Sequence, residues 1–223
     1  MQTIDEAREH GIVGKGIEKM EHGRVQLWEG GPFWAETNIG ADQPWEVGYY
    51  FWWGDTVGYK REHGAWVASG CSSFSFFTHT YGQTIEALKN GRWITANEVL
   101  APKHDAAQVQ WGGAWRMPTR QELEDLCDKC DWNWTKVHDI NGYIVRGKGG
   151  YAANSIFLPC AGYGSGTSLE SAVWFGSYWS SAPDSDCSTY AWYLDFSSSG
   201  HDTYGEDRDT GMSIRPVQGI LEG

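Results

Sequence analysis

The sequence predicts an α+β fold dominated by β-sheet, with many short antiparallel strands, one or two helices and long loops. Composition is the first indication. The chain has 29 glycines and an aromatic content of 15%, with 14 tryptophans, which favours tight turns and short aromatic-rich strands. Alternating apolar and polar residues recur in short runs, whereas only one segment shows a clear helical period. With 223 residues, the chain can bury a large core.

The first predicted elements form a β-hairpin. Residues 24–28 alternate between polar and apolar side chains, residues 30–32 (GGP) form a turn, and residues 33–39 form the second strand. Residues 1–23 are polar and carry charges of both signs, so we expect a linker or extension there. The remaining residues, 24–223, are predicted to form one domain.

Local signals are weaker over the next part of the chain. Residues 45–55 are rich in aromatic side chains, and residues 72–80 (SSFSFFTHT) have the composition of a strand. Residues 84–89 (TIEALK) fit a short helix that ends at Asn90 and Gly91. We expect loops and short elements that cover the core.

The clearest helix signal follows an irregular strand predicted at residues 111–118. Thr119 and Glu122 have the spacing of a capping box, in which each side chain bonds the backbone amide of the other residue. Apolar side chains then recur at helical spacing on one face: Leu123, Leu126, Cys127, Cys130. The pattern predicts a helix over about 120–130. Further along, strands are expected at 142–146 and 155–159, with a flexible loop at 161–166.

Residues 178–217 are the candidate functional segment. They begin with YWSS (178–181) and end with an alternating strand, MSIRPV (212–217). Leu194 and Phe196 are expected to point into the core. The remaining middle is crowded with Asp, Ser, Gly, Thr and Tyr, which suits a binding surface because aromatic residues give large contact area and small polar residues adapt their hydrogen bonds. We therefore expect a displayed binding loop between two strand anchors, the alternative being a polar surface loop without function.

The chain contains an odd number of cysteines, so at least one has no intramolecular partner: Cys71, Cys127, Cys130, Cys160, Cys187. The N-terminal residues lack the apolar core of a secretory signal, which indicates a protein that acts without this export route or has lost a leader. Reduced and mostly buried cysteines are therefore expected. Cys127 and Cys130 form a CxxC at the end of the predicted helix, facing inward, where core packing is preferred over a redox role.

Charge excludes several partners. The formal net charge is -12 and the sequence pI is about 4.9, so binding to nucleic acid gains no release of counterions from phosphates. An anionic membrane surface is disfavoured for the same reason. No run approaches the roughly 18 apolar residues of a membrane span.

No motif in the sequence supports catalysis or a cofactor. The chain contains no P-loop, no nucleophile elbow and no dinucleotide-binding glycine motif. The seven histidines are scattered, and none has zinc-finger spacing with a cysteine. A calcium site fits the sequence better than a zinc site, because acidic residues crowd one predicted loop: Asp202, Glu206, Asp207, Asp209. An acidic, solvated loop remains the preferred interpretation.

Seven blocks together resemble the Fibrobacter succinogenes-type major paralogous domain of Bacteroidetes and their phages. They are WA and NIGA within 34–41, WWGD (52–55), HDAA (104–107), WGGAWRMPT (111–119), NSIFLP (154–159), YWSS (178–181) and SIRPV (213–217). That group is similar to the C-type-lectin-fold variable proteins of diversity-generating retroelements, and more distantly to the formylglycine-generating enzyme fold. The resemblance covers about 24–218.

The resemblance implies a C-type-lectin-like fold whose C-terminal segment, about 178–217, is a ligand-binding face diversified by adenine-directed mutagenesis. AAY codons keep their final pyrimidine, and between Ala182 and Met212 only three residues break the resulting restriction: Trp192, Glu206, Met212. Fixed positions would include Leu194, Phe196, Arg208 and Gly211. The contact surface is expected to comprise Asp184, Ser185, Asp186, Cys187, Tyr190, Tyr193, Asp195, Ser197, His201, Asp202, Tyr204, Asp207, Asp209, Thr210 and Met212.

The leading hypothesis is a non-enzymatic receptor-binding or adhesion module, without cofactor or metal, on a phage tail or a bacterial cell surface. Its partner would be a protein or glycan receptor on a cell surface, with no nucleic acid and no membrane insertion, and a homo-oligomer is compatible with it. The absence of a secretory signal favours the phage. The alternatives are an enzyme on the related formylglycine-generating enzyme fold and a structural virion or cell-surface domain. Cys160 departs from the family pattern, no lectin calcium motif is present, and no catalytic cysteine pair can be assigned.

Overall fold

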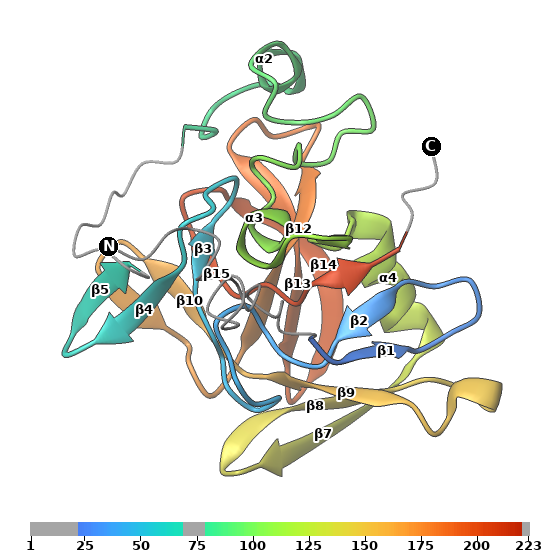
Figure 1. The fold of residues 1–223 in the computed structure, drawn as a ribbon. Coiled ribbons are helices and arrows are strands. Elements are labelled where there is room, and N and C mark those ends of the chain that lie inside the picture. Colours follow the sequence, from blue (N-terminus) through green and yellow to red (C-terminus); the bar gives the residue numbers. More distant parts are fainter. Residues whose placement is uncertain (1–21, 69–78, 220–223) are drawn as a thin grey trace, which may run out of the picture.

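A computed structural model describes residues 22–68 and 79–219 of the chain (Figure 1). Within these residues the helices are α2 (Ile85–Asn90), α3 (Ala106–Trp111), α4 (Arg120–Lys129) and a 3-10 turn (Gly149–Tyr151). The first strands are β1 (Arg24–Gln26), β2 (Phe33–Ala35), β3 (Phe51–Trp52), β4 (Tyr59–Glu62), β5 (Ala65–Ala68), β6 (Trp115–Arg116), β7 (Asp131–Val137) and β8 (Ile140–Arg146). The remaining strands are β9 (Ser155–Pro159), β10 (Tyr163–Ser165), β11 (Ser168–Glu170), β12 (Gly176–Pro183), β13 (Tyr190–Ser197), β14 (Gly200–Asp207), β15 (Gly211–Met212) and β16 (Val217–Gln218).

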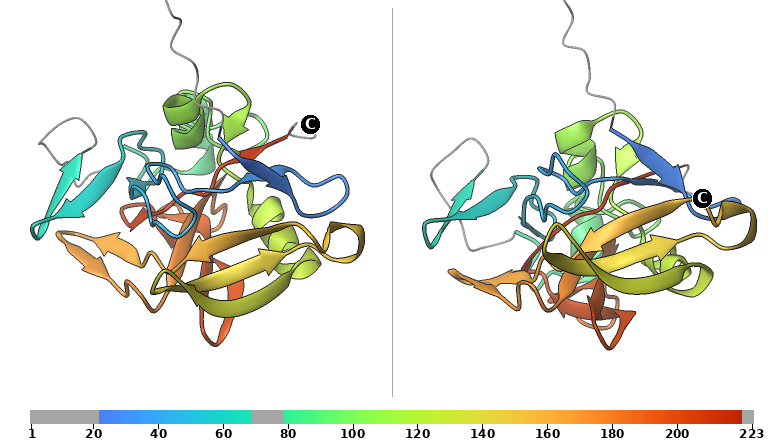
Figure 2. Two further views of the ribbon diagram at one scale, coloured as in Figure 1. Left: turned by 60° about the horizontal axis from the view of Figure 1, so that its bottom comes forward. Right: turned by 90° about the horizontal axis from the view of Figure 1, so that it is seen from below.

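The strands form several small sheets. One sheet has the order β1-β2-β16-β6 and joins the first described strand to the last, and a second has the order β11-β10-β15-β3. Two three-stranded sheets, β12-β13-β14 and β7-β8-β9, and the β4–β5 hairpin complete the set in the described ranges. Figure 1 shows β12, β13 and β14 at the centre, with the β7–β9 sheet across the bottom, and this sheet comes forward in Figure 2. The paired strands are antiparallel, which confirms the predicted α+β class.

Several local predictions are confirmed. Residues 24–35 form the β1–β2 hairpin, whose strands are shorter than expected. The short helix α2 begins after the N-cap Thr84 and ends at Gly91. Helix α4 occupies almost the whole predicted range and has the predicted capping box between Thr119 and Glu122. None of the helices in the described ranges is long and apolar enough to cross a membrane.

Other predictions were wrong or lie outside the described residues. The described part contains three α-helices, one more than expected. The additional helix is α3, which Asp105 caps by accepting a hydrogen bond from the Gln108 amide. The predicted flexible loop at 161–166 contains β10. Trp111 closes α3 and is not part of a strand, so the irregular strand at 111–118 reduces to β6. Most of the strand proposed at 72–80, and nearly all of the linker at 1–23, lie outside the described residues.

Two hydrophobic clusters lie on the two faces of the β12–β13–β14 sheet. Tyr178, Leu194 and Phe196 belong to the first cluster, together with side chains of α4 and the β7–β9 sheet. Trp179 and Ala191 belong to the second, together with side chains of α2, α3 and β3. The period of two along the strands therefore places neighbouring residues in different clusters. Leu194 and Phe196 are each 1% exposed, as predicted.

The C-terminal run at 212–217 was expected to alternate between buried and exposed side chains. Every residue in it is buried, and only its ends belong to strands β15 and β16. Its polar members are satisfied inside the protein: the Ser213 hydroxyl donates to the Val47 carbonyl, and the guanidinium of Arg215 makes several bonds to buried acceptors. Alternation in the sequence therefore reflects polar groups with buried partners, not a solvated strand face.

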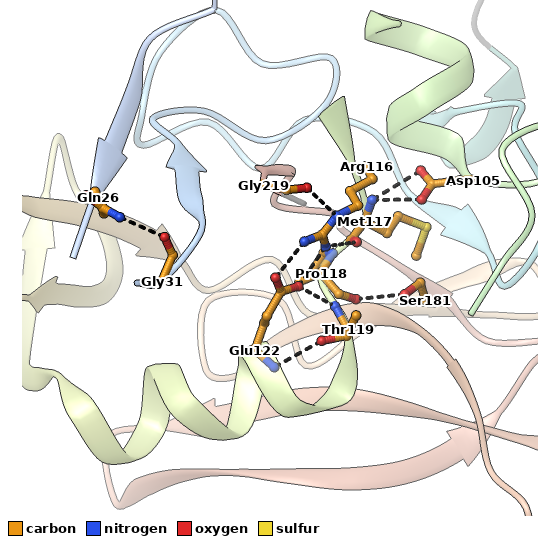
Figure 3. A network of polar contacts seen from close by, with 10 residues as sticks. All are labelled: Gln26, Gly31, Asp105, Arg116, Met117, Pro118, Thr119, Glu122, Ser181 and Gly219. Atoms are coloured by element: carbon orange, nitrogen blue, oxygen red, sulfur yellow. Dashed lines mark hydrogen bonds and ion pairs between the residues drawn. The ribbon is translucent and has the colours of Figure 1, made fainter. Parts of the chain in front are cut away.

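A polar network fixes the start of α4 against β6 (Figure 3). The Arg116 guanidinium makes two hydrogen bonds to the Glu122 carboxylate, at 2.6 and 2.7 Å, and a third of 3.3 Å to the carbonyl of Gly219. Glu122 also accepts a bond from the Thr119 amide, and the Thr119 hydroxyl accepts one from the Glu122 amide. The Ser181 hydroxyl donates to the Pro118 carbonyl, which ties β12 to the same turn.

Replacing Thr119 by alanine is expected to lower the free energy of unfolding by about 1 kcal/mol, because the Glu122 amide loses its side-chain acceptor. Chemical denaturation monitored by circular dichroism measures this change. Thr167→Ala, at an exposed turn, serves as the control and should change the free energy by less than about 0.5 kcal/mol. Equal effects of the two substitutions would contradict a capping role.

Candidate functional site

The segment predicted as a displayed loop is largely a β-hairpin. Strands β13 and β14 pair along their whole length, from Tyr190 opposite Asp207 to Ser197 opposite Gly200. Strand β12 pairs on the other side of β13, with an irregularity between Trp179 and Pro183. The hairpin places the predicted contact residues in three separate groups, because neighbouring side chains along a strand point to opposite faces.

The first group lies at the end where β13 begins and β14 finishes. It contains the turn residues Asp184, Ser185, Asp186 and Cys187, and also Tyr190, Asp207 and Asp209. The Asp184 carboxylate accepts bonds from the amides of Asp186 (2.7 Å) and Cys187 (3.2 Å), so Asp184 has a structural role in the turn. Ser185, Asp186 and Asp209 are exposed.

The second group lies on one face of the hairpin. Tyr193 stands opposite Tyr204, with ring centroids 6.4 Å apart, and Asp195 stands opposite Asp202. Tyr204 is 51% exposed, whereas Tyr193 is half-buried and its ring meets Trp179 at 6.0 Å. This face therefore combines an aromatic pair with two carboxylates.

The third group surrounds the β13–β14 turn. Ser197 bonds Ser199 at 2.7 Å across the turn. The His201 ring stacks on Trp132 at 4.1 Å, on the face of the hairpin that carries Phe196. Burial lowers the pKa of His201, so the imidazole is held neutral against the aromatic cluster. His201 is therefore engaged in packing and does not belong to an open contact surface.

Thr210 was wrongly assigned to the contact surface, and Met212 is not displayed on the hairpin but lines a small pocket beside it. Thr210 is 8% exposed and Met212 is 1% exposed. Met212 belongs to β15, which pairs with Phe51 of β3 at the centre of the molecule, and its side chain joins the second hydrophobic cluster. Two of the predicted fixed positions are tightly packed: Arg208 is fully buried, and a Cβ on Gly211 would lie 3.0 Å from the Trp52 ring.

A pocket of about 200 Å³ opens beside the second group, and we call it the acidic pocket. Strands β10, β12, β13, β14 and β15 and the 171–175 segment contribute its lining: Tyr163, Ser171, Phe175, Ser177, Tyr193, Asp195, Glu206, Met212. The Ser177 hydroxyl donates to Asp195 at 3.4 Å. Burial and the nearby charge of Glu206 raise the pKa of Asp195, and the bond from Ser177 partly offsets this increase.

Sequence reasoning missed much of this pocket. Tyr163 and Phe175 precede the candidate segment, and Glu206 was not among the predicted contact residues. The signal available was the apolar run Val173-Trp174-Phe175 directly before β12, which is unusual for an exposed loop. Trp174 is 67% exposed, the most exposed large hydrophobic side chain among the described residues.

The acidic residues considered for calcium do not converge on one point. They lie on and just after β14, where Asp202 and Glu206 occupy one face of the strand and Asp207 the opposite face. Across residues 22–68 and 79–219, no group of three His, Cys, Asp or Glu side chains is arranged to hold a metal ion. Strand geometry thus separates residues that the sequence places close together.

The four cysteines in the described residues are free thiols, as expected, and Cys71 lies outside this part. Cys130 and Cys160 are buried, and Cys127 and Cys187 are half-buried. Burial raises the pKa of both Cys127 and Cys160 to about 12 and that of Cys130 to about 11. Cys130 belongs to the first hydrophobic cluster and Cys127 packs against it, and their raised pKa values do not suit a redox CxxC, which needs a lowered thiol pKa.

The fold and the site define a β-rich domain that carries an exposed hairpin face and a small pocket near its C-terminus. The Lcl C-terminal domain family matches residues 83–218, and the chain therefore belongs to this family. The matched range includes the blocks at 111–119, 178–181 and 213–217, whereas the block at 52–55 precedes it. Neither a curated protein nor a solved structure matches the chain.

Proposed function

We propose that this chain is a non-enzymatic ligand-binding protein that displays a retroelement-diversified surface on its C-terminal hairpin. In this proposal the domain has a C-type-lectin-like fold and serves as a receptor-binding or adhesion module on a phage tail or a bacterial cell surface. Its partner is a protein or glycan receptor on a cell surface. Membership of the Lcl C-terminal domain family and the motif blocks at 111–119, 178–181 and 213–217 support this function.

One observation carries the proposal, namely the division of the hairpin between buried and displayed positions. Leu194, Phe196 and Arg208 are at most 1% exposed, and they connect the hairpin to the hydrophobic clusters and to the neighbouring loop. Tyr204 and Asp202, on the adjacent strand, are exposed. Exposed side chains contribute little to the stability of a fold, so displayed positions can change while the buried frame is kept.

Three of the described thiols, at 127, 130 and 160, do not suit thiol catalysis. A formylglycine-generating type of enzyme depends on reactive cysteines, and the described cysteines at 127, 130 and 160 have raised pKa values caused by burial. The exposed aromatic side chains, Trp174 and Tyr204, are instead typical anchors of binding surfaces.

Sequencing the DNA around the coding region tests the proposal. We expect a reverse-transcriptase gene and a near-copy of the part that encodes residues 178–217, with differences at adenines of the copy. The differences should fall in codons of exposed positions, such as Tyr204 and Asp202, and spare those of Leu194, Phe196 and Arg208. A locus without reverse transcriptase and near-copy would contradict diversification, as would differences spread equally over buried and exposed codons.

A further inference from the structure

The acidic pocket holds negative charge without a neutralising cation. Its two carboxylates, Asp195 and Glu206, form no ion pair with a Lys, Arg or His of the described residues. Asp195 accepts one weak bond from Ser177, and one oxygen of Glu206 accepts a 2.9 Å bond from the Asp207 amide. The whole chain, including these two carboxylates, carries a formal net charge of -12. The pocket is therefore electrostatically complementary to a positively charged group.

The pocket walls are aromatic. Tyr163, Phe175 and Tyr193 line it beside the carboxylates, and Met212 adds an apolar surface. Aromatic faces attract cations through their quadrupole, and they also pack against aliphatic stems. An apolar wall next to carboxylates suits a ligand group with an aliphatic stem and a cationic head.

The size of the pocket limits what can enter it. Its volume of about 200 Å³ is below the roughly 300–1,000 Å³ typical of small-molecule sites, so the cavity suits one side chain. Exposed hydrophobic side chains adjoin its lining residues: Val173 (48% exposed) and Trp174 (67%) directly precede Phe175, and Tyr204 (51%) stands opposite Tyr193. Exposed aromatic residues around a small pocket are typical of protein–protein contacts.

The segment that carries Trp174 is held in place by its backbone. The amides of Trp174 and Phe175 both donate to the Ser171 carbonyl at 3.1 Å, and the Phe175 carbonyl accepts a 2.8 Å bond from Gly162. Val173 has a φ of 70°, a strained conformation for a β-branched residue, and its carbonyl accepts a bond from the Asn141 side chain. Trp174 is thus displayed by a preorganised segment, which lowers the entropic cost of binding.

We propose that the acidic pocket binds a lysine or arginine side chain of a protein ligand, with Trp174 and Tyr204 packing against the surface around that side chain. This inference rests on the proposed function and narrows the receptor to a protein with an exposed basic residue. Part of the site, Tyr163, Ser171 and Phe175, lies before the diversified segment. These residues would keep the preference for a cation while the hairpin changes.

The test titrates the purified chain with three capped amino acids and follows backbone amide signals by NMR. The probes are N-acetyl-lysine N-methylamide, the arginine equivalent, and the uncharged norleucine equivalent as a control. We expect the two cationic probes to shift the signals of Ser177 and Asp195, and norleucine to bind at least about fivefold more weakly. The comparison of lysine with arginine identifies which head group fits better.

Glu206→Gln and Asp195→Asn are each expected to weaken binding of the cationic probes about fivefold or more. Asp139→Asn is the matched control, because it changes the net charge equally at an exposed position in the β7–β8 turn, outside the pocket and outside the predicted contact surface, and should leave the affinity unchanged. Thermal unfolding verifies that each variant is folded. If Asp195→Asn fails to fold, the affinity of Glu206→Gln for the cationic probes tests the proposal by itself.

Equal binding of norleucine, or equal weakening by Asp139→Asn, would overturn the inference, as would unchanged affinity in Glu206→Gln. The proposed function is tested separately by the near-copy of the coding region. A diversified locus combined with no binding of the cationic probes would refute the ligand class and leave the binding function standing. Cationic binding without a diversified locus would support the pocket and contradict the diversification.

Discussion

Replacing Arg215 by methionine is expected to lower the free energy of unfolding by about 3 kcal/mol. Arg215 is 1% exposed, and its guanidinium donates to the Asn38 side chain at 2.8 Å, the Phe157 carbonyl at 2.9 Å and the Ala35 carbonyl at 3.3 Å. The side chain thereby joins the C-terminal run to β2 and β9. Methionine fills similar space but leaves these three acceptors without their donor.

The size of this effect follows from two opposing terms. A hydrogen bond to a charged group contributes about 1.5–3 kcal/mol, so three of them outweigh a desolvation cost of several kcal/mol for the buried cation. Burial also lowers the pKa of Arg215 to about 10, which leaves the group charged at neutral pH. Removing the charge recovers its desolvation cost, and the expected loss is therefore smaller than the sum of the three bonds.

Chemical denaturation of Arg215→Met measures the change, with Arg146→Met as the control. Arg146 is exposed on β8, and its replacement should alter the free energy of unfolding by at most about 0.5 kcal/mol. Arg215→Lys should recover little stability, because an ammonium cannot reach three acceptors with the geometry of a guanidinium. A stable Arg215→Met protein would show that the buried cation does not hold these segments together.

Features encoded within a few residues could be predicted from the sequence. The capping box at Thr119 and Glu122 depends on contacts three residues apart, and helix α4 lies within one residue of its expected range. Leu194 and Phe196 are two positions apart in a strand, so their shared inward face followed from the pleat. In each case the signal and the structure it predicts lie on the same element.

Features that depend on long-range pairing were missed. The acidic pocket brings Tyr163 and Phe175 beside Asp195 and Glu206, through the pairing of β12 with β13, of β13 with β14 and of β10 with β15. No residue spacing in the sequence predicts that these four side chains line one pocket. The position of Met212 was missed for a related reason, since only its pairing with Phe51 shows that it lies off the exposed hairpin and in the pocket wall.

Replacing Phe196 by alanine is expected to lower the free energy of unfolding by about 3–5 kcal/mol. Phe196 is 1% exposed, and its ring lies 5.8 Å from that of Tyr178 and 5.5 Å from that of Tyr143. The ring also covers Gly176, where a Cβ would lie 2.0 Å from it, so this part of the sheet cannot easily collapse into the vacated space. The lost packing contacts and the cavity left behind therefore both lower the free energy of unfolding.

Tyr204→Ala is the matched control on the neighbouring strand. Tyr204 is 51% exposed, and its ring pairs with that of Tyr193 across the strands, so its removal should lower the free energy of unfolding by at most about 1 kcal/mol. Chemical denaturation compares the two variants directly. If the hairpin tolerates the loss of the Tyr204 ring but not that of Phe196, its stability does not depend on its displayed side chains. A surface whose residues vary requires this independence. Similar losses in both variants would contradict that independence and, with it, the proposed variable face.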